Sequence, residues 1–228
     1  FAQQNPIGEK LGNAAYLLQN NRLDEAEKIL RELVKSAPSN VDAHNLLGIT
    51  LDKNGNRDEA EREYRAALKL NPKAVSPLTN LGVLLAKSGR ETEATDVFVR
   101  VLQLDPEHQQ ATANLGLLYY SAGKYEKAAV FLEKAVRIQP NDPELLLDLG
   151  TALLATKKYD DAARYLTAAA DVSPKNAEPV YHLSVLAYSR SNDVNAQTYF
   201  EKAIELNPSH IAANFMLGEL HAKHQEYI

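Results

Sequence analysis

The chain has 228 residues, of which 45% are hydrophobic and 24% are charged, and its formal net charge at pH 7 is −5. It contains no cysteine, which excludes disulfides, thiolate catalysis and cysteine-ligated zinc. No stretch approaches the roughly 18 consecutive apolar residues of a membrane-spanning helix. The acidic balance argues against a nucleic-acid partner, because such proteins usually carry a clustered basic face.

The first six residues form an N-terminal extension ahead of the first periodic segment. The chain begins with Phe1 rather than Met. We therefore expect it to be a processed product or a part of something longer.

From residue 7 onward the sequence repeats with a period of 34 residues. Prolines recur at this spacing at Pro38, Pro72, Pro106, Pro140, Pro174 and Pro208. Glycines share it at Gly48, Gly82, Gly116, Gly150 and Gly218, and alanines at Ala26, Ala60, Ala94, Ala128, Ala162 and Ala196. The period predicts six repeats and the first helix of a seventh, with boundaries at 7–40, 41–74, 75–108, 109–142, 143–176, 177–210 and 211–228.

Each repeat is predicted to form two helices, and the second repeat shows why. Residues 41–54 carry apolar side chains at helical spacing, and Gly55 follows as glycine does after a helix end. Asp58 is then the expected N-cap of the second helix, with Glu61 three residues on. That helix ends near Leu70, because the following Asn-Pro cannot continue it. The predicted caps of first helices are Asn40, Asp142 and Asn176.

These features together resemble the tetratricopeptide repeat family. The Leu-Gly pair lies mid-helix, where glycine indicates a close approach of two helices, and it is followed by the periodic alanine and the closing proline. The pairs end at Gly48, Gly82, Gly116, Gly150 and Gly218. The resemblance implies an all-α, right-handed superhelical solenoid of antiparallel helix pairs whose first helices line a concave binding side. The family's usual early Trp is absent, and Asn13 replaces the expected Leu in the first repeat.

Residues that could carry catalysis or bind metal are better explained by the repeat. The acidic pairs at 24–25, 58–59 and 160–161 recur at a helix start, where they complement the helix dipole. His221 and His224, with Glu219 and Glu226, could share a helix face for a metal, but packing of His221 is the favoured interpretation. We therefore expect no enzyme, no cofactor and no metal.

A basic series follows the turns between helices. Its members are Arg22, Lys53, Arg57, Lys87, Arg90, Lys124, Lys157 and Lys158. The series could meet an acidic partner, but cations near a helix C-terminus are also favoured by the dipole, and we prefer that structural interpretation.

The variable positions of the first helices predict the binding site. They combine apolar and tyrosine side chains, which would form a groove, with a polar ladder of Asn80, Asn114 and Asp148 that could pair with the backbone of an extended peptide. The predicted partner-binding residues are Asn45, Asn80, Val83, Asn114, Leu117, Tyr120, Leu147, Asp148, Thr151, Leu154, Tyr181, His182, Val185 and Tyr188.

The functional prediction is a scaffold that binds a protein or peptide ligand on its concave side. The alternative is the interaction arm of a larger enzyme or secretion or assembly machine whose effector domain lies outside this chain. Residues 211–228 carry apolar side chains such as Phe215 and Leu220 without a second helix to cover them. We therefore expect the native protein to continue, and this helix to self-associate. No nucleic acid and no membrane insertion are expected.

Overall fold

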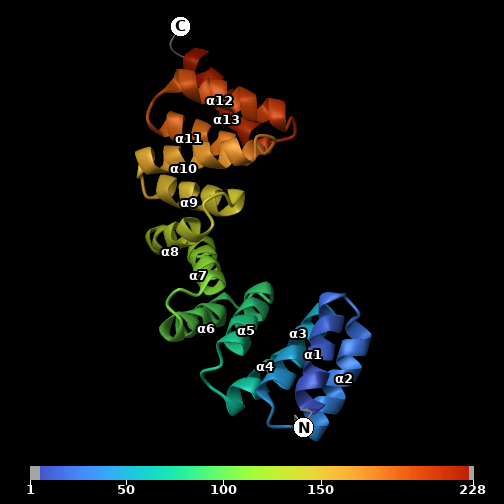
Figure 1. Ribbon diagram of the computed structural model, residues 1–228. Coiled ribbons are helices and arrows are strands. Elements are labelled where there is room, and N and C mark those ends of the chain that lie inside the picture. The colour runs from blue at the N-terminus through green and yellow to red at the C-terminus, as the bar shows by residue number, and fades with distance from the viewer. Residues whose placement is uncertain (1–5, 226–228) are drawn as a thin grey trace. The chain divides into compact units, whose positions relative to one another are not determined.

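The computed structural model describes residues 6–225, with side chains to residue 223, and these residues form thirteen α-helices and no strand (Figure 1). The predicted number of helices is confirmed for this part of the chain. The helices are α1 (Pro6–Gln19), α2 (Leu23–Ser36), α3 (Val41–Lys53), α4 (Arg57–Leu70), α5 (Val75–Lys87), α6 (Glu91–Leu104), α7 (Gln109–Ser121), α8 (Tyr125–Ile138), α9 (Pro143–Ala155), α10 (Tyr159–Val172), α11 (Ala177–Ser189), α12 (Asp193–Leu206) and α13 (Ile211–Gln225).

The chain divides into two compact units, residues 1–114 and 115–228, and each is described by itself. Within each unit a helix packs against the helices that precede and follow it in sequence. First helices of successive repeats also touch, since α3 contacts both α1 and α5, and α9 contacts α11. In the described residues, successive second helices of one unit show no packing of that extent. The first helices therefore gather on one side of each unit, which we call the first-helix face. The hand of a superhelix and the repeat boundaries stay predictions.

The small residue that recurs at the mid-helix position of the repeats has a steric cause. A Cβ added to Gly82 would lie 2.8 Å from Cε1 of Phe98, a fully buried ring on α6. At Gly116 an added Cβ would lie 2.9 Å from Cγ of Leu132 and 3.2 Å from that residue's backbone nitrogen. The second helix thus presses a large side chain, sixteen residues further on, against a glycine of the first helix. This packing explains why a residue that weakens an isolated helix stands here.

The predicted caps of first helices are confirmed. The Asn40 side chain accepts a hydrogen bond from the backbone N–H of Ala43 at 2.8 Å, and Asp142 accepts from Leu145 at 3.0 Å. Asn176 accepts from Glu178 in the same way. The prediction for Asp58 was wrong, because α4 begins at Arg57 and Asp58 lies inside its first turn. There its carboxylate acts through the helix dipole instead of as a cap.

The turn between the two helices of a repeat holds one residue in the left-handed region. In three repeats that residue is glycine, for example Gly89 with φ +73°. In the others it is Asn21, Lys157 or Ser191, with φ between 55° and 61°. Such a backbone favours glycine and is tolerated by asparagine, so the turns at Lys157 and Ser191 carry local strain.

No helix among the described residues is long and apolar enough to cross a membrane. The structure also groups no three His, Asp or Glu side chains as metal ligands in residues 6–223. Of the histidine pair considered above, His221 is exposed on α13, so the interpretation of this residue as a packing residue was wrong. The side chain of His224 and all of Glu226 lie outside the described residues.

Candidate binding face

Side chains of neighbouring first helices meet along a seam, and two predicted site residues show its geometry. The amide nitrogen of Asn80 on α5 donates a hydrogen bond of 2.9 Å to Oδ1 of Asn45 on α3. Asn45 is only 8% exposed, so it positions Asn80 and offers little surface to a ligand. Val83, one turn further on α5, is half-buried. In this unit the start of the predicted polar ladder is an internal contact.

The predicted residues of α7 do not extend the ladder. The Asn114 side chain donates to the carbonyl of Gln110 in its own helix at 2.7 Å. Leu117 is exposed, and the half-buried Tyr120 packs edge-on against Tyr125, with ring centroids 5.5 Å apart. Leu117 therefore remains available to a partner, while Tyr120 is held by its own repeat.

The largest set of predicted residues in one unit lies on two neighbouring first helices, and we call it the α9–α11 face. All of its members are half-buried: Leu147, Asp148 and Leu154 on α9, and Tyr181, His182, Val185 and Tyr188 on α11. Thr151 does not belong to it, because it is only 6% exposed and its hydroxyl donates to the backbone carbonyl of Asp148 at 3.0 Å. The face combines apolar, aromatic and acidic groups.

Asp148 is the chemically unusual member of this face. Burial, with the nearby charges of Glu144 and Asp142, raises the pKa of its carboxyl to about 6. The structure places no hydrogen bond or ion pair on this carboxylate among the described residues. Burial lowers the pKa of His182, which holds the corresponding position on α11, so this imidazole is neutral near pH 7. The carboxylate therefore lacks a compensating positive charge.

Tyr181 and Tyr188 are anchored by residues that the sequence did not single out. The Tyr181 ring lies 4.6 Å from the ring of His210 and 6.2 Å from that of Phe200. Nζ of Lys223 on α13 lies 5.5 Å from the centre of the Tyr188 ring and forms an ion pair of 2.9 Å with Asp193.

His210 also caps α13. Its Nδ1 accepts the backbone N–H of Ala213 at 3.2 Å, and its Nε2 lies 3.4 Å from Oε1 of Glu178. His210 occupies the same repeat position as the caps Asn40, Asp142 and Asn176, so this spacing could have revealed it.

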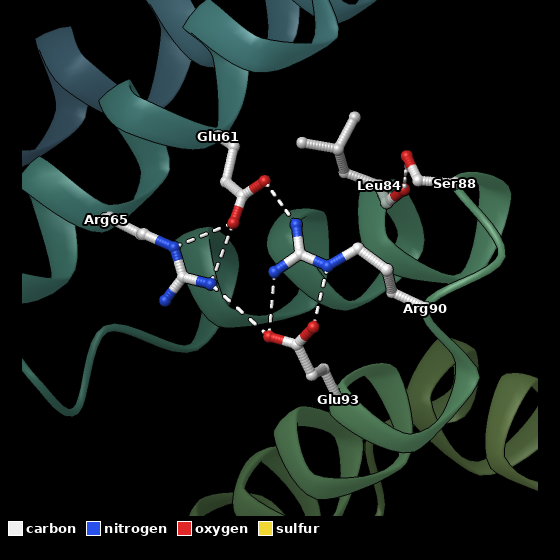
Figure 2. A network of polar contacts seen from close by, with 6 residues as sticks. All are labelled: Glu61, Arg65, Leu84, Ser88, Arg90 and Glu93. Carbon is white, nitrogen blue, oxygen red and sulfur yellow. Dashed lines mark hydrogen bonds and ion pairs between the residues drawn. The ribbon is translucent and has the colours of Figure 1, made fainter.

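The second helices of the first unit carry networks of ion pairs. Figure 2 shows the Arg90 guanidinium between two carboxylates, at 2.6 Å from Glu61 and 2.7 Å from Glu93. Arg65 completes the network through Glu61 at 2.8 Å. Although burial alone would raise the pKa of Glu61, its two arginine partners hold it below the ordinary value.

An equivalent network, one repeat earlier, joins Arg31 to Glu27 and Glu59. Of the basic series predicted along the turns, Arg22 pairs with Glu25, Arg90 with Glu61 and Lys87 with Asp52. Lys53 and Lys87 end α3 and α5, where the dipole favours a cation, as the structural interpretation requires. For the residues at the start of second helices that interpretation was wrong, because the dipole there does not favour a cation: Arg22, Arg57, Arg90, Lys124 and Lys158.

Three surface depressions among the described residues lie on turns and second helices, at residues 55–62, 24–31 and 172–176. The groove predicted on the first-helix face stays a prediction.

Comparison with known proteins identifies the class. Sequence profiles of the tetratricopeptide repeat match residues 17–81, 85–149, 119–186 and 179–210. The chain therefore belongs to the tetratricopeptide repeat family, as its Leu-Gly pairs and closing prolines indicated, and it has the all-α helical-repeat fold of that family. Most proteins of this family are non-catalytic scaffolds that bind proteins or peptides.

Solved structures share the fold. YrrB, described as a tetratricopeptide repeat protein with an unusual peptide-binding site, is 22% identical; the match covers 86% of this chain and 97% of YrrB with a TM-score of 0.78. PilF of Pseudomonas aeruginosa is 25% identical over 93% of this chain and 97% of its own, with a TM-score of 0.75. MamA of Desulfovibrio magneticus RS-1 is 24% identical over 75% and 96%, with a TM-score of 0.69. No curated protein sequence gives a significant match.

Proposed function

We propose that this chain is a binding scaffold that does not itself catalyse a reaction, and that it holds a protein or peptide partner on its first-helix face. Membership of the repeat family supports the class of function. That YrrB has a peptide-binding site shows that this fold can carry one, although at 22% identity the likeness extends to the fold alone. The location of the site is argued from this chain's own residues.

The observation that carries the proposal is the α9–α11 face. Seven half-buried side chains of mixed apolar, aromatic and acidic character lie on two helices that touch each other. Partly exposed apolar side chains that gather on one surface are typical of interaction sites, and tyrosines contribute strongly to interfaces because they order few torsions on binding. By contrast, charged side chains of the second helices in the first unit already form ion pairs with one another. We therefore assign the site to the α9–α11 face, which holds the largest set of predicted residues in one unit.

The test is selection of ligands from a random peptide library on the immobilised chain. Leu154→Gln combined with Val185→Gln makes the α9–α11 face polar without changing its charge, and we expect it to abolish binding of the selected peptides. The matched control is Val172→Gln combined with Val194→Gln, on second helices where these residues are 42% and 77% exposed. The control should bind normally.

Circular dichroism of both variants checks that helicity is retained. Peptides that bind the α9–α11 variant normally, or that lose binding in the control, would place the site elsewhere.

A further inference from the structure

The two first helices of the α9–α11 face carry charge of one sign only, whereas α13, the next first helix, carries Lys223. Neither α9 nor α11 contains a lysine or arginine, and neither does α7. Their charged residues are Glu144, Asp148 and Glu178, and the α9 cap Asp142 adds a further carboxylate. The chain as a whole has 25 basic residues for 30 acidic ones, so the absence of basic residues is specific to these helices.

Asp148 lies within this acidic region at a position where another repeat forms a contact between first helices. Asn80 holds the same repeat position on α5, and its amide reaches Asn45 on the preceding first helix. A half-buried carboxylate at such a position loses hydration. The acidic groups on its own helix do not offset that cost, and no described residue forms a hydrogen bond or ion pair with it. On α11, Glu178 is also acidic and His182 is neutral near pH 7. The missing partner is a cation.

We propose that the α9–α11 face binds a peptide segment that presents a Lys or Arg side chain to Asp148, with apolar side chains on either side that lie against Leu154 and Val185. This inference rests on the proposed function and specifies the partner's chemistry. The apolar members of the α9–α11 face support a peptide over a free polyamine, because apolar side chains of a peptide bury more surface against them than the short methylene segments of a polyamine: Leu147, Leu154, Val185 and Tyr188. Tyr188 already has the cation of Lys223 near its ring, so the aromatic surface tolerates a positive group.

The experiment compares ligand selection on the parent chain and on Asp148→Asn. From a random peptide library the parent should enrich peptides with a Lys or Arg between apolar residues, and Asp148→Asn should lose the basic preference. A selected peptide should bind the parent about tenfold more tightly than the same peptide with Gln in place of the basic residue, because a hydrogen bond to a charged group is worth about 1.5–3 kcal/mol. In Asp148→Asn this ratio should approach one. Asp171→Asn, an exposed position on α10, is the matched control and should keep the ratio.

The outcomes separate this inference from the proposed function. Selected peptides without basic enrichment, whose binding still requires Leu154 and Val185, would overturn the cation while leaving the binding face intact. If no peptide is enriched, both proposals fail. If spermidine displaces a selected peptide when present at the same concentration as that peptide, the site recognises positive charge alone. That result would overturn the proposal that the ligand is a peptide.

Discussion

The contact between Gly82 and Phe98 gives a quantitative test of the packing argument. In Gly82→Ala the new methyl group would lie 2.8 Å from Cε1 and 2.9 Å from Cζ of the ring, well inside ordinary van der Waals contact. Phe98 is fully buried, so the ring cannot turn outward to make room. Replacing glycine by alanine in a helix gains about 0.5–1 kcal/mol, whereas overpacking a core costs about 1–3 kcal/mol. We expect a net loss of about 1 kcal/mol.

A matched control exists in the same repeat position of α13. A Cβ added to Gly218 meets nothing within 4 Å, so Gly218→Ala should stabilise the chain by about 0.5–1 kcal/mol through helix propensity alone. Gly116→Ala should cost more than Gly82→Ala, because the backbone nitrogen of Leu132 lies 3.2 Å from the added Cβ and α8 itself must move. Gly82→Leu and Gly116→Leu should be more damaging still.

Urea unfolding followed by circular dichroism measures these differences. The dependence of the unfolding free energy on urea concentration should be the same in parent and variants. Phe98→Leu should partly restore the stability of Gly82→Ala, because it removes the ring atoms that clash. If Gly82→Ala shifts the urea midpoint upward as Gly218→Ala does, the glycine does not hold a close helix contact and the packing argument is refuted.

Three further predictions concern strain, charge and self-association. Lys157→Gly should stabilise the chain by about 1 kcal/mol in urea unfolding, since Lys157 has φ 61°, and no gain would show that the turn is unstrained. Asp148 has a folded-state pKa of about 6, raised above its unfolded value, so the stability of the fold should fall as the pH rises from 4 to 6. Asp148→Asn should remove that pH dependence and raise the free energy of unfolding at pH 7 by about 1 kcal/mol, allowing for residual solvent screening. Thermal melts of the variant that show an unchanged pH dependence would contradict this. Ile211 and Phe215 are 85% and 63% exposed, so sedimentation at rising concentration should show association that Ile211→Ser with Phe215→Ser abolishes, and a monomeric parent would refute it.

The fold was predictable because its determinants are local and periodic. The caps Asn40 and Asp142 lie within three residues of the groups that they bind, and the mid-helix glycines from Gly48 to Gly150 mark contacts inside one repeat. Asp58 misled the prediction because an acidic residue fits both a cap and a first turn, and only the backbone distinguishes the two. Sequence spacing therefore predicted the presence of each helix more reliably than the residue at which the helix begins.

The binding face was less predictable because burial depends on neighbouring helices. Asn45 and Thr151 occupy variable positions of first helices, yet the structure buries both. The pair formed by Arg31 and Glu59 spans 28 residues and depends on how two repeats stack. Helical periodicity identifies the side of a helix that a residue occupies, but it does not show how closely the next repeat covers that side.

The glycine contact also determines where this chain could be recombined with its own repeats. Gly82 and Phe98 come from the same 34-residue segment, so copying or exchanging a whole repeat transfers both partners together. A crossover in the turn between the two helices would separate them. In a chimera that joins the first helix containing Gly116 to a second helix carrying Phe98, a ring would replace Leu132. The native second helix is already close there, because the backbone nitrogen of Leu132 lies 3.2 Å from a Cβ added at Gly116. Viable chimeras should therefore have their junctions at the closing prolines, and duplication of intact repeats is the route by which such an array can lengthen without repacking.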